Sequence, residues 1–217
     1  MKLKNKLNIT CDGGAATGKS TGAKLIAKKY KLAFMSSGLL YRYVGYLILK
    51  YNPKNKVNFI NNKFKKLNYK NLNKINLHTQ KISAFTAIIA KNPKIRNILK
   101  KYQINFVKKN SGCVLEGRDS STKILPSSDV KFFFICNLNI AAKRRFKELK
   151  KKGSKNIKLK DVKEALRARN ITDKQRSISP LQKHPLAIIV NSGKLNINSM
   201  VGKMSFHIEN ILKKKYG

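Results

Sequence analysis

Short apolar runs alternate along this chain with longer segments in which apolar residues recur at helical spacing. The strand-like runs cover residues 7–11, 32–35, 112–116, 130–136 and 187–191. Helical patterns occupy residues 21–30, 37–50, 80–91, 93–109, 140–152, 160–169 and 198–214. Such alternation predicts an α/β fold, in which a parallel five-stranded sheet carries helices on both faces. Ligands of such sheets bind at the carboxyl ends of the strands.

Two segments depart from this pattern. Residues 51–77 are rich in Asn and Lys and weakly periodic, which indicates a small insertion at 51–78 rather than sheet core. Residues 153–156 form a polar break between two basic helical patterns, as expected for the hinge of a helical lid, which we place at 141–179. A chain of 217 residues can bury one sizeable core with such additions, so we expect a single domain over residues 1–217.

The charge is extreme, with 49 Lys and Arg against 9 Asp and Glu. The excess consists of 41 Lys spread along the chain and accompanied by 23 Asn, without a basic block or an aromatic stripe. This distribution indicates a compositional bias, so we expect no specific nucleic-acid partner. In a chain that uses Lys by default, the 8 Arg mark positions where a planar, bidentate group is needed to bind phosphate.

Membrane and metal-site signals are weak. No uncharged apolar stretch approaches the ~20 residues that span a bilayer, and no apolar leader follows the first lysines, so we expect a cytoplasmic protein without membrane contact. We also expect a monomer. Cys11, Cys113 and Cys136 lack the spacing of a zinc site or a disulfide framework, and we interpret them as small buried apolar residues.

The segment from Gly13 to Ser20 fits the phosphate-binding pattern G-x-x-x-x-G-K-[ST] at every fixed position, between a predicted strand and a predicted helix. Glycines allow backbone N–H groups to point at phosphate oxygens, Lys19 can reach the β- and γ-phosphates of ATP, and the Ser20 hydroxyl can bind Mg²⁺. The sequence therefore predicts a P-loop fold that uses ATP and Mg²⁺. The predicted ATP-binding residues are Gly13, Gly14, Ala15, Ala16, Thr17, Gly18, Lys19, Ser20 and Thr21.

Several separated motifs resemble those of bacterial cytidylate kinases, in the same order. They are the P-loop, Ser36 to Arg42, Asn92 to Arg96, Glu116 to Asp119, Arg144-Arg145, and the spacing of Arg169, Asp173, Arg176 and Ser179-Pro180-Leu181. The similarity covers nearly the whole chain. It implies a three-layer P-loop kinase, with a small acceptor-binding insertion and a helical lid, that transfers the ATP γ-phosphoryl group to CMP or dCMP.

The resemblance also assigns roles to residues. It implies that the acceptor is bound by Ser37, Arg42, Arg96, Arg118, Asp119, Arg169, Asp173 and Arg176. The residues expected to act on the transferred group are Lys19, Arg118, Arg145 and Arg176. These types suit phosphoryl transfer, because two polyanionic substrates must be neutralised within a few ångströms and no strong base is required.

Some assignments stay open. Glu116 ends an apolar run where P-loop proteins place an acid that orients Mg²⁺ through water, but it could equally pair with Lys19 or Arg118. Asp12 is a weaker candidate for orienting Lys19 or the acceptor phosphate. Arg144 could be solvated helix charge.

The chain departs from the family pattern in several places, including Ala87, Ser121 and Asn170 in place of a serine, a glycine and an acidic residue. These changes affect base selection and the lid more than the phosphate machinery. Two alternatives therefore remain: another P-loop kinase, for shikimate, dephospho-coenzyme A or a different nucleotide, and a P-loop ATPase stimulated by nucleic acid.

Overall fold

The computed structural model describes residues 7–151, 153–154 and 156–216. The described chain divides into two compact units. The first unit comprises the described residues up to Phe34 and from Gly112 onward, and the second comprises Met35–Ser111. The segment 51–78, which the sequence marked as an insertion, lies inside the second unit.

The sheet has five strands in the order β2-β3-β1-β4-β5. Their bounds are β1 Leu7–Gly13, β2 Ala33–Ser36, β3 Gly112–Gly117, β4 Val130–Ile135 and β5 Ile188–Asn191. β1 lies at the centre and pairs in parallel with both β3 and β4, and β4 pairs in parallel with β5. The prediction of a parallel five-stranded sheet is confirmed, and the central strand leads directly into the glycine-rich loop.

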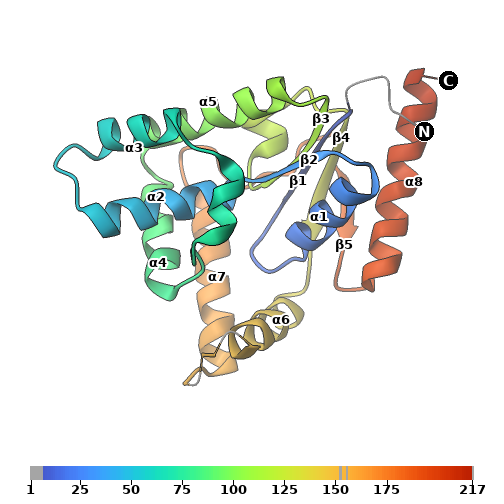
Figure 1. The fold of residues 1–217 in the computed structure, drawn as a ribbon. Helices are drawn as coiled ribbons and strands as arrows, with labels where there is room; N and C mark the ends of the chain where they lie inside the picture. Colours follow the sequence, from blue (N-terminus) through green and yellow to red (C-terminus); the bar gives the residue numbers. More distant parts are fainter. Residues whose placement is uncertain (1–6, 152, 155, 217) are drawn as a thin grey trace. The chain divides into compact units, whose positions relative to one another are not determined.

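The first unit also contains α1 Lys19–Lys29, α6 Leu138–Lys151, α7 Leu159–Gln175, α8 Ile197–Tyr216 and the π-helical turn η2 Ser120–Ile124. Figure 1 shows α1 and α8 side by side along the sheet. Their apolar faces join those of β1 and β4 in one core, which includes the fully buried Ile26, Phe132 and Met204. This core fixes the start of α1, because the helix is packed against the strands that carry the loop.

A second, smaller core lies between α6 and α7, where Ala142 and Leu166 pack with Ala15 of the glycine-rich loop. The expected lid helices are therefore present, and α7 continues past Arg169 to Gln175. Gly153 lies between them with a φ of 83° and with no atom within 4 Å of the position of a Cβ. Glycine suits this left-handed position, where other residues are strained.

The second unit consists of α2 Ser37–Tyr51, α3 Lys56–Lys65, the 3₁₀ turn η1 Tyr69–Lys74, α4 Gln80–Ile89 and α5 Pro93–Lys109. The sequence analysis did not predict α3. Its signals are local: the Asn55 side chain accepts a hydrogen bond from the Asn58 N–H at the start of the helix, and Ile60 and Phe64, four residues apart, are buried.

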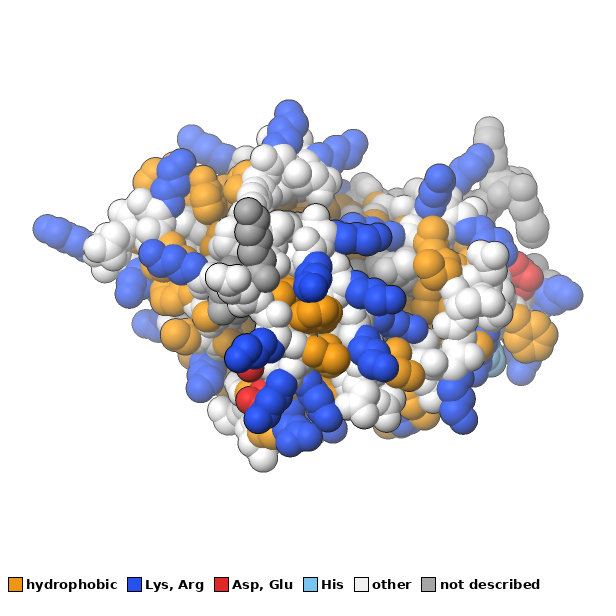
Figure 2. Space-filling model, turned by 90° about the horizontal axis from the view of Figure 1, so that it is seen from below, with side chains coloured by type: hydrophobic (Ala, Val, Ile, Leu, Met, Phe, Trp, Pro, Cys, Tyr) orange, Lys and Arg blue, Asp and Glu red, His pale blue; other side chains and the backbone are white. Residues whose placement is uncertain are grey.

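The structure bears on the expectations for the cysteines, for membrane-spanning segments and for the surface charge. Cys11 and Cys113 are buried as predicted, but Cys136 is only half-buried, because β4 ends one residue before it. In the described part of the chain, no helix is long and apolar enough to cross a bilayer. Figure 2 shows Lys and Arg side chains recurring across the whole width of the face that it draws, with few acidic ones among them.

Candidate active site

The glycine-rich loop joins the end of β1 to the start of α1. A Cβ at Gly13 would lie 2.5 Å from the backbone oxygen of Phe134 on β4, so only glycine fits there. Gly18 has a φ of 77° and precedes α1 without a side-chain cap on the helix. The Lys19 ammonium and the Thr17 hydroxyl each donate to the Gly14 carbonyl at 3.0 Å. The backbone is thus curled as an anion-binding loop at a helix N-terminus.

Lys19 is buried, and its Nζ lies 3.4 Å from Oε1 of the buried Glu116. Burial and the nearby Arg118 outweigh the attraction of Glu116 and lower the pKa of Lys19 from 10.5 to about 8. An ammonium whose charged form is disfavoured by burial is well matched to a polyanionic ligand, which would favour that charged form. The contact with Glu116 corresponds to the ion-pair alternative for this residue, and its magnesium role stays a prediction.

Two residues that the sequence analysis did not propose as ligands contact the loop. Asn170 of α7 accepts a hydrogen bond from the Ala15 N–H through its Oδ1, at 3.0 Å. Ser192, just after β5, donates its hydroxyl to the Thr17 carbonyl at 2.7 Å. Arg144 of α6 donates to the hydroxyl and the carbonyl of Ser192, at 3.1 and 2.8 Å. Arg144 is therefore engaged near the loop, contrary to its interpretation as solvated helix charge.

The turn after β3 carries Arg118 and Asp119. Asp12, at the end of β1, accepts hydrogen bonds from the N–H groups of Ser120 and Ser121 at 2.9 and 2.7 Å and from the Ser121 hydroxyl at 2.7 Å. Both oxygens of Asp12 are thus directed at this turn rather than at Lys19, and its role toward the acceptor phosphate stays a prediction. Burial is the main reason that its pKa is raised, although the three hydrogen bonds oppose this.

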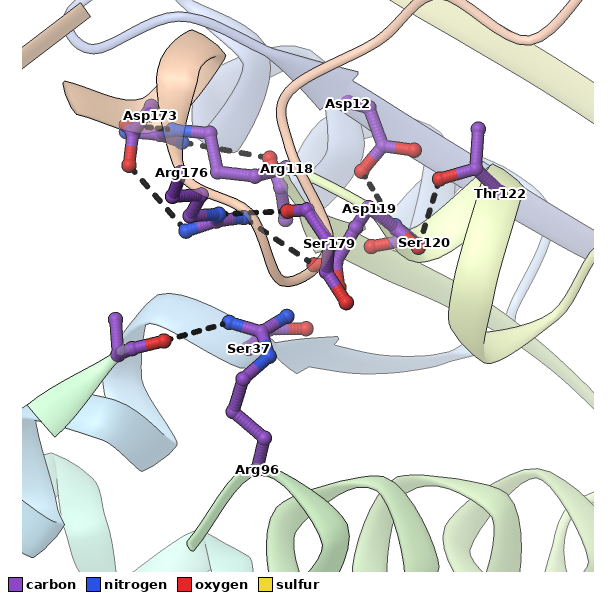
Figure 3. Close-up of polar contacts among 12 residues, drawn as sticks. Asp12, Ser37, Arg96, Arg118, Asp119, Ser120, Thr122, Asp173, Arg176 and Ser179 are labelled. Atoms are coloured by element: carbon purple, nitrogen blue, oxygen red, sulfur yellow. Dashed lines mark hydrogen bonds and ion pairs between the residues drawn. The ribbon is translucent and has the colours of Figure 1, made fainter. Parts of the chain in front are cut away.

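An ionic cluster lies beyond this turn, as Figure 3 shows. Arg118 Nε donates to Asp173 Oδ2 at 2.8 Å, and Arg176 contacts Asp173 Oδ1 at 3.4 Å and Asp119 Oδ1 at 4.0 Å. Arg176 also donates from Nε to the Ser179 carbonyl at 2.6 Å, at a residue with a φ of 51°. A left-handed serine is strained, and strain of this kind concentrates at functional sites.

Arginine charges dominate the environment of Asp173 in this cluster. Burial raises the pKa of Asp173, but Arg118, Arg169 and Arg176 outweigh it and hold that pKa below its usual value. The charge of Arg169 also lowers the pKa of Lys19, which shows that Arg169 acts on both the loop lysine and the acidic cluster. Four of the predicted acceptor residues in the first unit thus interact directly or through their fields, and Asp119 joins them through Arg176.

Arg145 lies apart from these contacts. It forms an ion pair with Glu148, one turn along α6, at 2.8 Å. The proposed role of Arg145 on the transferred group is therefore not supported by a contact with the loop or the cluster. Arg167 of α7 is exposed.

The remaining predicted acceptor residues belong to the second unit and are buried within it. The Ser37 hydroxyl donates to the Gln103 side chain. Arg42 donates to the Leu77 carbonyl at 3.2 Å and to the Ser83 hydroxyl at 2.6 Å.

Arg96 lies in the first turn of α5, as predicted from Pro93. It donates to the Ala90 carbonyl at 3.1 Å, and its guanidinium carbon lies 5.5 Å from the centre of the Tyr41 ring. Burial with several directed contacts favours the interpretation that these arginines were retained for geometry rather than for surface charge.

Spacing on α7 could have identified Asn170 in advance. It lies four residues after the buried Leu166 and three before Asp173, so it shares their face of the helix. Ser192 offers no comparable signal, because its role depends on where the end of β5 meets the loop.

Comparisons with known proteins agree with the motifs. The sequence model of the cytidylate kinase family matches residues 9–210. The chain is 35% identical to a cytidylate kinase of Bartonella tribocorum, over 94% of this chain and 95% of that protein, and 32% identical to one of Rickettsia rickettsii, over 96% and 94%. A shikimate kinase structure from Bacteroides thetaiotaomicron superposes with a TM-score of 0.51 at 11% identity, covering 94% of this chain and 98% of that one, and so shares the fold. The chain belongs to the cytidylate kinase family.

Proposed function

We propose that this protein is an ATP-dependent nucleoside monophosphate kinase that converts CMP or dCMP to the diphosphate, with release of ADP. One observation carries the proposal beyond the family name. The first unit holds the buried Lys19 of an anion-binding loop together with a cluster of arginines and carboxylates that Arg169 links to it electrostatically. Such a set can neutralise a nucleotide triphosphate and a second phosphate, and phosphoryl transfer depends mainly on positioning and charge.

The residues of the loop fit ATP and Mg²⁺. The first turn of α1 has no side-chain cap, so its N–H groups face the direction from which a phosphate would bind. Ser20 is exposed in that turn, and Glu116 is buried beside Lys19. Both supply oxygen, the ligand that Mg²⁺ prefers, with Glu116 acting through water. The metal would neutralise charge on the phosphates, while Lys19 binds the β- and γ-phosphates.

We assign the acceptor to the arginine and carboxylate residues. Arg118 and Arg176 would bind its phosphate, and Arg169 and Asp173 its sugar hydroxyls. Arg176 would also stabilise the charge that develops on the transferred group. Ser37, Arg42, Arg96 and Asp119 complete the proposed set on the strength of the motif resemblance.

In the described structure, Asp173 pairs with Arg118 and Arg176. An acceptor phosphate would compete with Asp173 for these guanidinium groups, leaving the carboxylate to accept hydrogen bonds from the sugar.

A coupled assay of ADP release tests the proposal. The panel contains CMP, dCMP, UMP, shikimate and dephospho-coenzyme A, with a no-acceptor sample tested with and without DNA or RNA. We expect turnover with CMP and dCMP, lower turnover with UMP, and none with the other acceptors. Turnover with shikimate but not CMP, or ADP release that depends on nucleic acid alone, would overturn the assignment. A cytoplasmic location and a monomeric state are further parts of the proposal, tested by fractionation and by light scattering.

A further inference from the structure

Asp12 is buried at 0% exposure at the carboxyl end of the central strand, yet the proposed chemistry gives it no part. Both oxygens of its carboxylate accept hydrogen bonds. Oδ1 accepts from the Ser120 N–H, and Oδ2 accepts from the N–H and the hydroxyl of Ser121. Figure 3 shows Asp12 directed toward the turn that contains Asp119 and Ser120.

The register of the sheet adds a second connection. Asp12 on β1 pairs with Gly117, the last residue of β3. The two residues between these anchors are Arg118 and Asp119. Asp12 therefore holds both ends of the short segment that carries them: Gly117 through strand pairing, and Ser120 with Ser121 through its side chain. Within the turn itself, the N–H groups of Lys123 and Ile124 bond back to the Asp119 carbonyl.

We propose that Asp12 is a positioning residue for the acceptor, acting through Arg118 and Asp119; this inference rests on the proposed function. Its side chain makes no hydrogen bond to Lys19, whose contacts are the Gly14 carbonyl and Glu116. Loss of the Asp12 carboxylate should therefore displace the acceptor arginine more than the ATP-binding lysine.

Ser121 strengthens this arrangement in the present chain. The family pattern has a glycine here, which would supply only the backbone N–H. The serine hydroxyl adds a third donor to the buried carboxylate at 2.7 Å. A hydrogen bond to a charged acceptor is stronger than one between neutral groups, so substitution of Ser121 weakens the hold of Asp12 on the turn without removing the carboxylate.

The first test is Asp12→Asn, which keeps the size of the side chain but turns an NH₂ group toward backbone donors. We expect the KM for CMP to rise at least about 10-fold, from the loss of a charge-assisted hydrogen bond, while the KM for ATP changes less than about 2-fold. Ser121→Ala is the milder variant, which keeps both backbone bonds, and should raise the KM for CMP about 2- to 5-fold.

Ser128→Ala is the matched control. It removes the buried hydrogen bond, 3.0 Å long, between the hydroxyls of Ser128 and Thr10, and Thr10 lies on β1 like Asp12. The turn that carries Arg118 and Asp119 is not changed, so both KM values should stay the same. Equal changes in the two KM values of Asp12→Asn, or the same selective shift in Ser128→Ala, would overturn the proposal. Equally, an unchanged KM for CMP in both Asp12→Asn and Ser121→Ala would overturn it.

Hydrogen exchange separates failure of this inference from failure of the proposed function. Whatever the acceptor is, Asp12→Asn should speed exchange at the amides of Ser120 and Ser121 by about 10-fold or more relative to Ser128→Ala. Protected amides in Asp12→Asn would show that the carboxylate does not hold the turn. If the wild-type protein did not use CMP, but the amides of Ser120 and Ser121 exchanged faster in Asp12→Asn, the proposed function would fail. The inference that Asp12 positions the turn would still stand.

Discussion

Replacement of Lys19 by Met should make the ligand-free protein more stable while abolishing its activity. The side chain is 5% exposed, and its charged form is disfavoured because burial and Arg118 outweigh the attraction of Glu116. Methionine has a similar length and no charge. The substitution therefore separates what the lysine costs the fold from what it contributes to phosphate binding.

The magnitude follows from the lowered pKa of Lys19. A change from 10.5 to about 8 corresponds to a penalty of about 3 kcal/mol for the charged form at neutral pH. Loss of the hydrogen bond to the Gly14 carbonyl and of the ion pair with Glu116 reduces the gain on substitution. We expect Lys19→Met to raise the free energy of unfolding by about 1–3 kcal/mol, with about 2–4 °C in Tm for each kcal/mol. Turnover should fall at least about 100-fold.

The assay is thermal unfolding at pH 7 without nucleotide, combined with initial rates. Because the unfolded chain binds more protons than the folded one between pH 8 and 10.5, wild-type stability should rise over that range relative to the variant, and the difference between them should shrink. Lys131→Met is the matched control, since burial also lowers the pKa of this β4 lysine, which has no proposed contact with substrate. It should retain turnover. A Tm of Lys19→Met at or below that of wild type, or near-normal turnover, would refute the reasoning.

Three further outcomes are expected. The kcat/KM for ATP should fall as pH rises through about 8, because the free enzyme loses the Lys19 proton there. The kcat should depend less on pH, and a kcat/KM that stayed constant to pH 10 would contradict the prediction. Arg176→Lys should lower kcat about 100-fold despite the retained charge, because a lysine cannot contact Ser179 and Asp173 together; kinetics near wild type would exclude the clamp. Asn170→Ala should leave the Kd for ATP unchanged or lower it about 2- to 5-fold, because the Asn170 side chain then no longer competes with phosphate for the Ala15 N–H. Weaker binding of ATP by calorimetry would show that Asn170 binds the nucleotide itself.

The sequence predicted the strands, their parallel direction and the anion-binding loop, because the alternation of strands with helices and the glycine-rich motif can both be seen in it. Alternating apolar residues define β1, a continuous apolar run marks β3, and glycine is required at Gly13 and Gly18 by the backbone itself. The helix α3 was missed because Asn and Lys mask the short apolar spacing of Ile60 and Phe64. Periodicity over a long window does not detect two buried side chains on one turn.

The site residues divide in a similar way. Arg118, Asp173 and Arg176 could be selected from the sequence, because arginine is rare in this lysine-rich chain and these residues match motif positions. Their ion pairs with one another could not be predicted, since these depend on where α7 lies relative to the end of β3. The partner of Asp12 could not be selected for the same reason: its place in the sequence puts it next to the loop, whereas its side chain bonds to the turn that follows β3.

Two departures from the family pattern acquire a physical reason from these contacts. Ser121, where a glycine is usual, supplies a hydroxyl to the buried Asp12, and Asn170, where an acid is usual, accepts from the loop N–H of Ala15. The amide of Asn170 meets a group that phosphate would also use, without adding a second negative charge beside it. Ser121 therefore supports the turn that carries Arg118 and Asp119, whereas Asn170 accepts from a loop N–H that phosphate would also use. Neither substitution removes a group that we propose to carry the transfer.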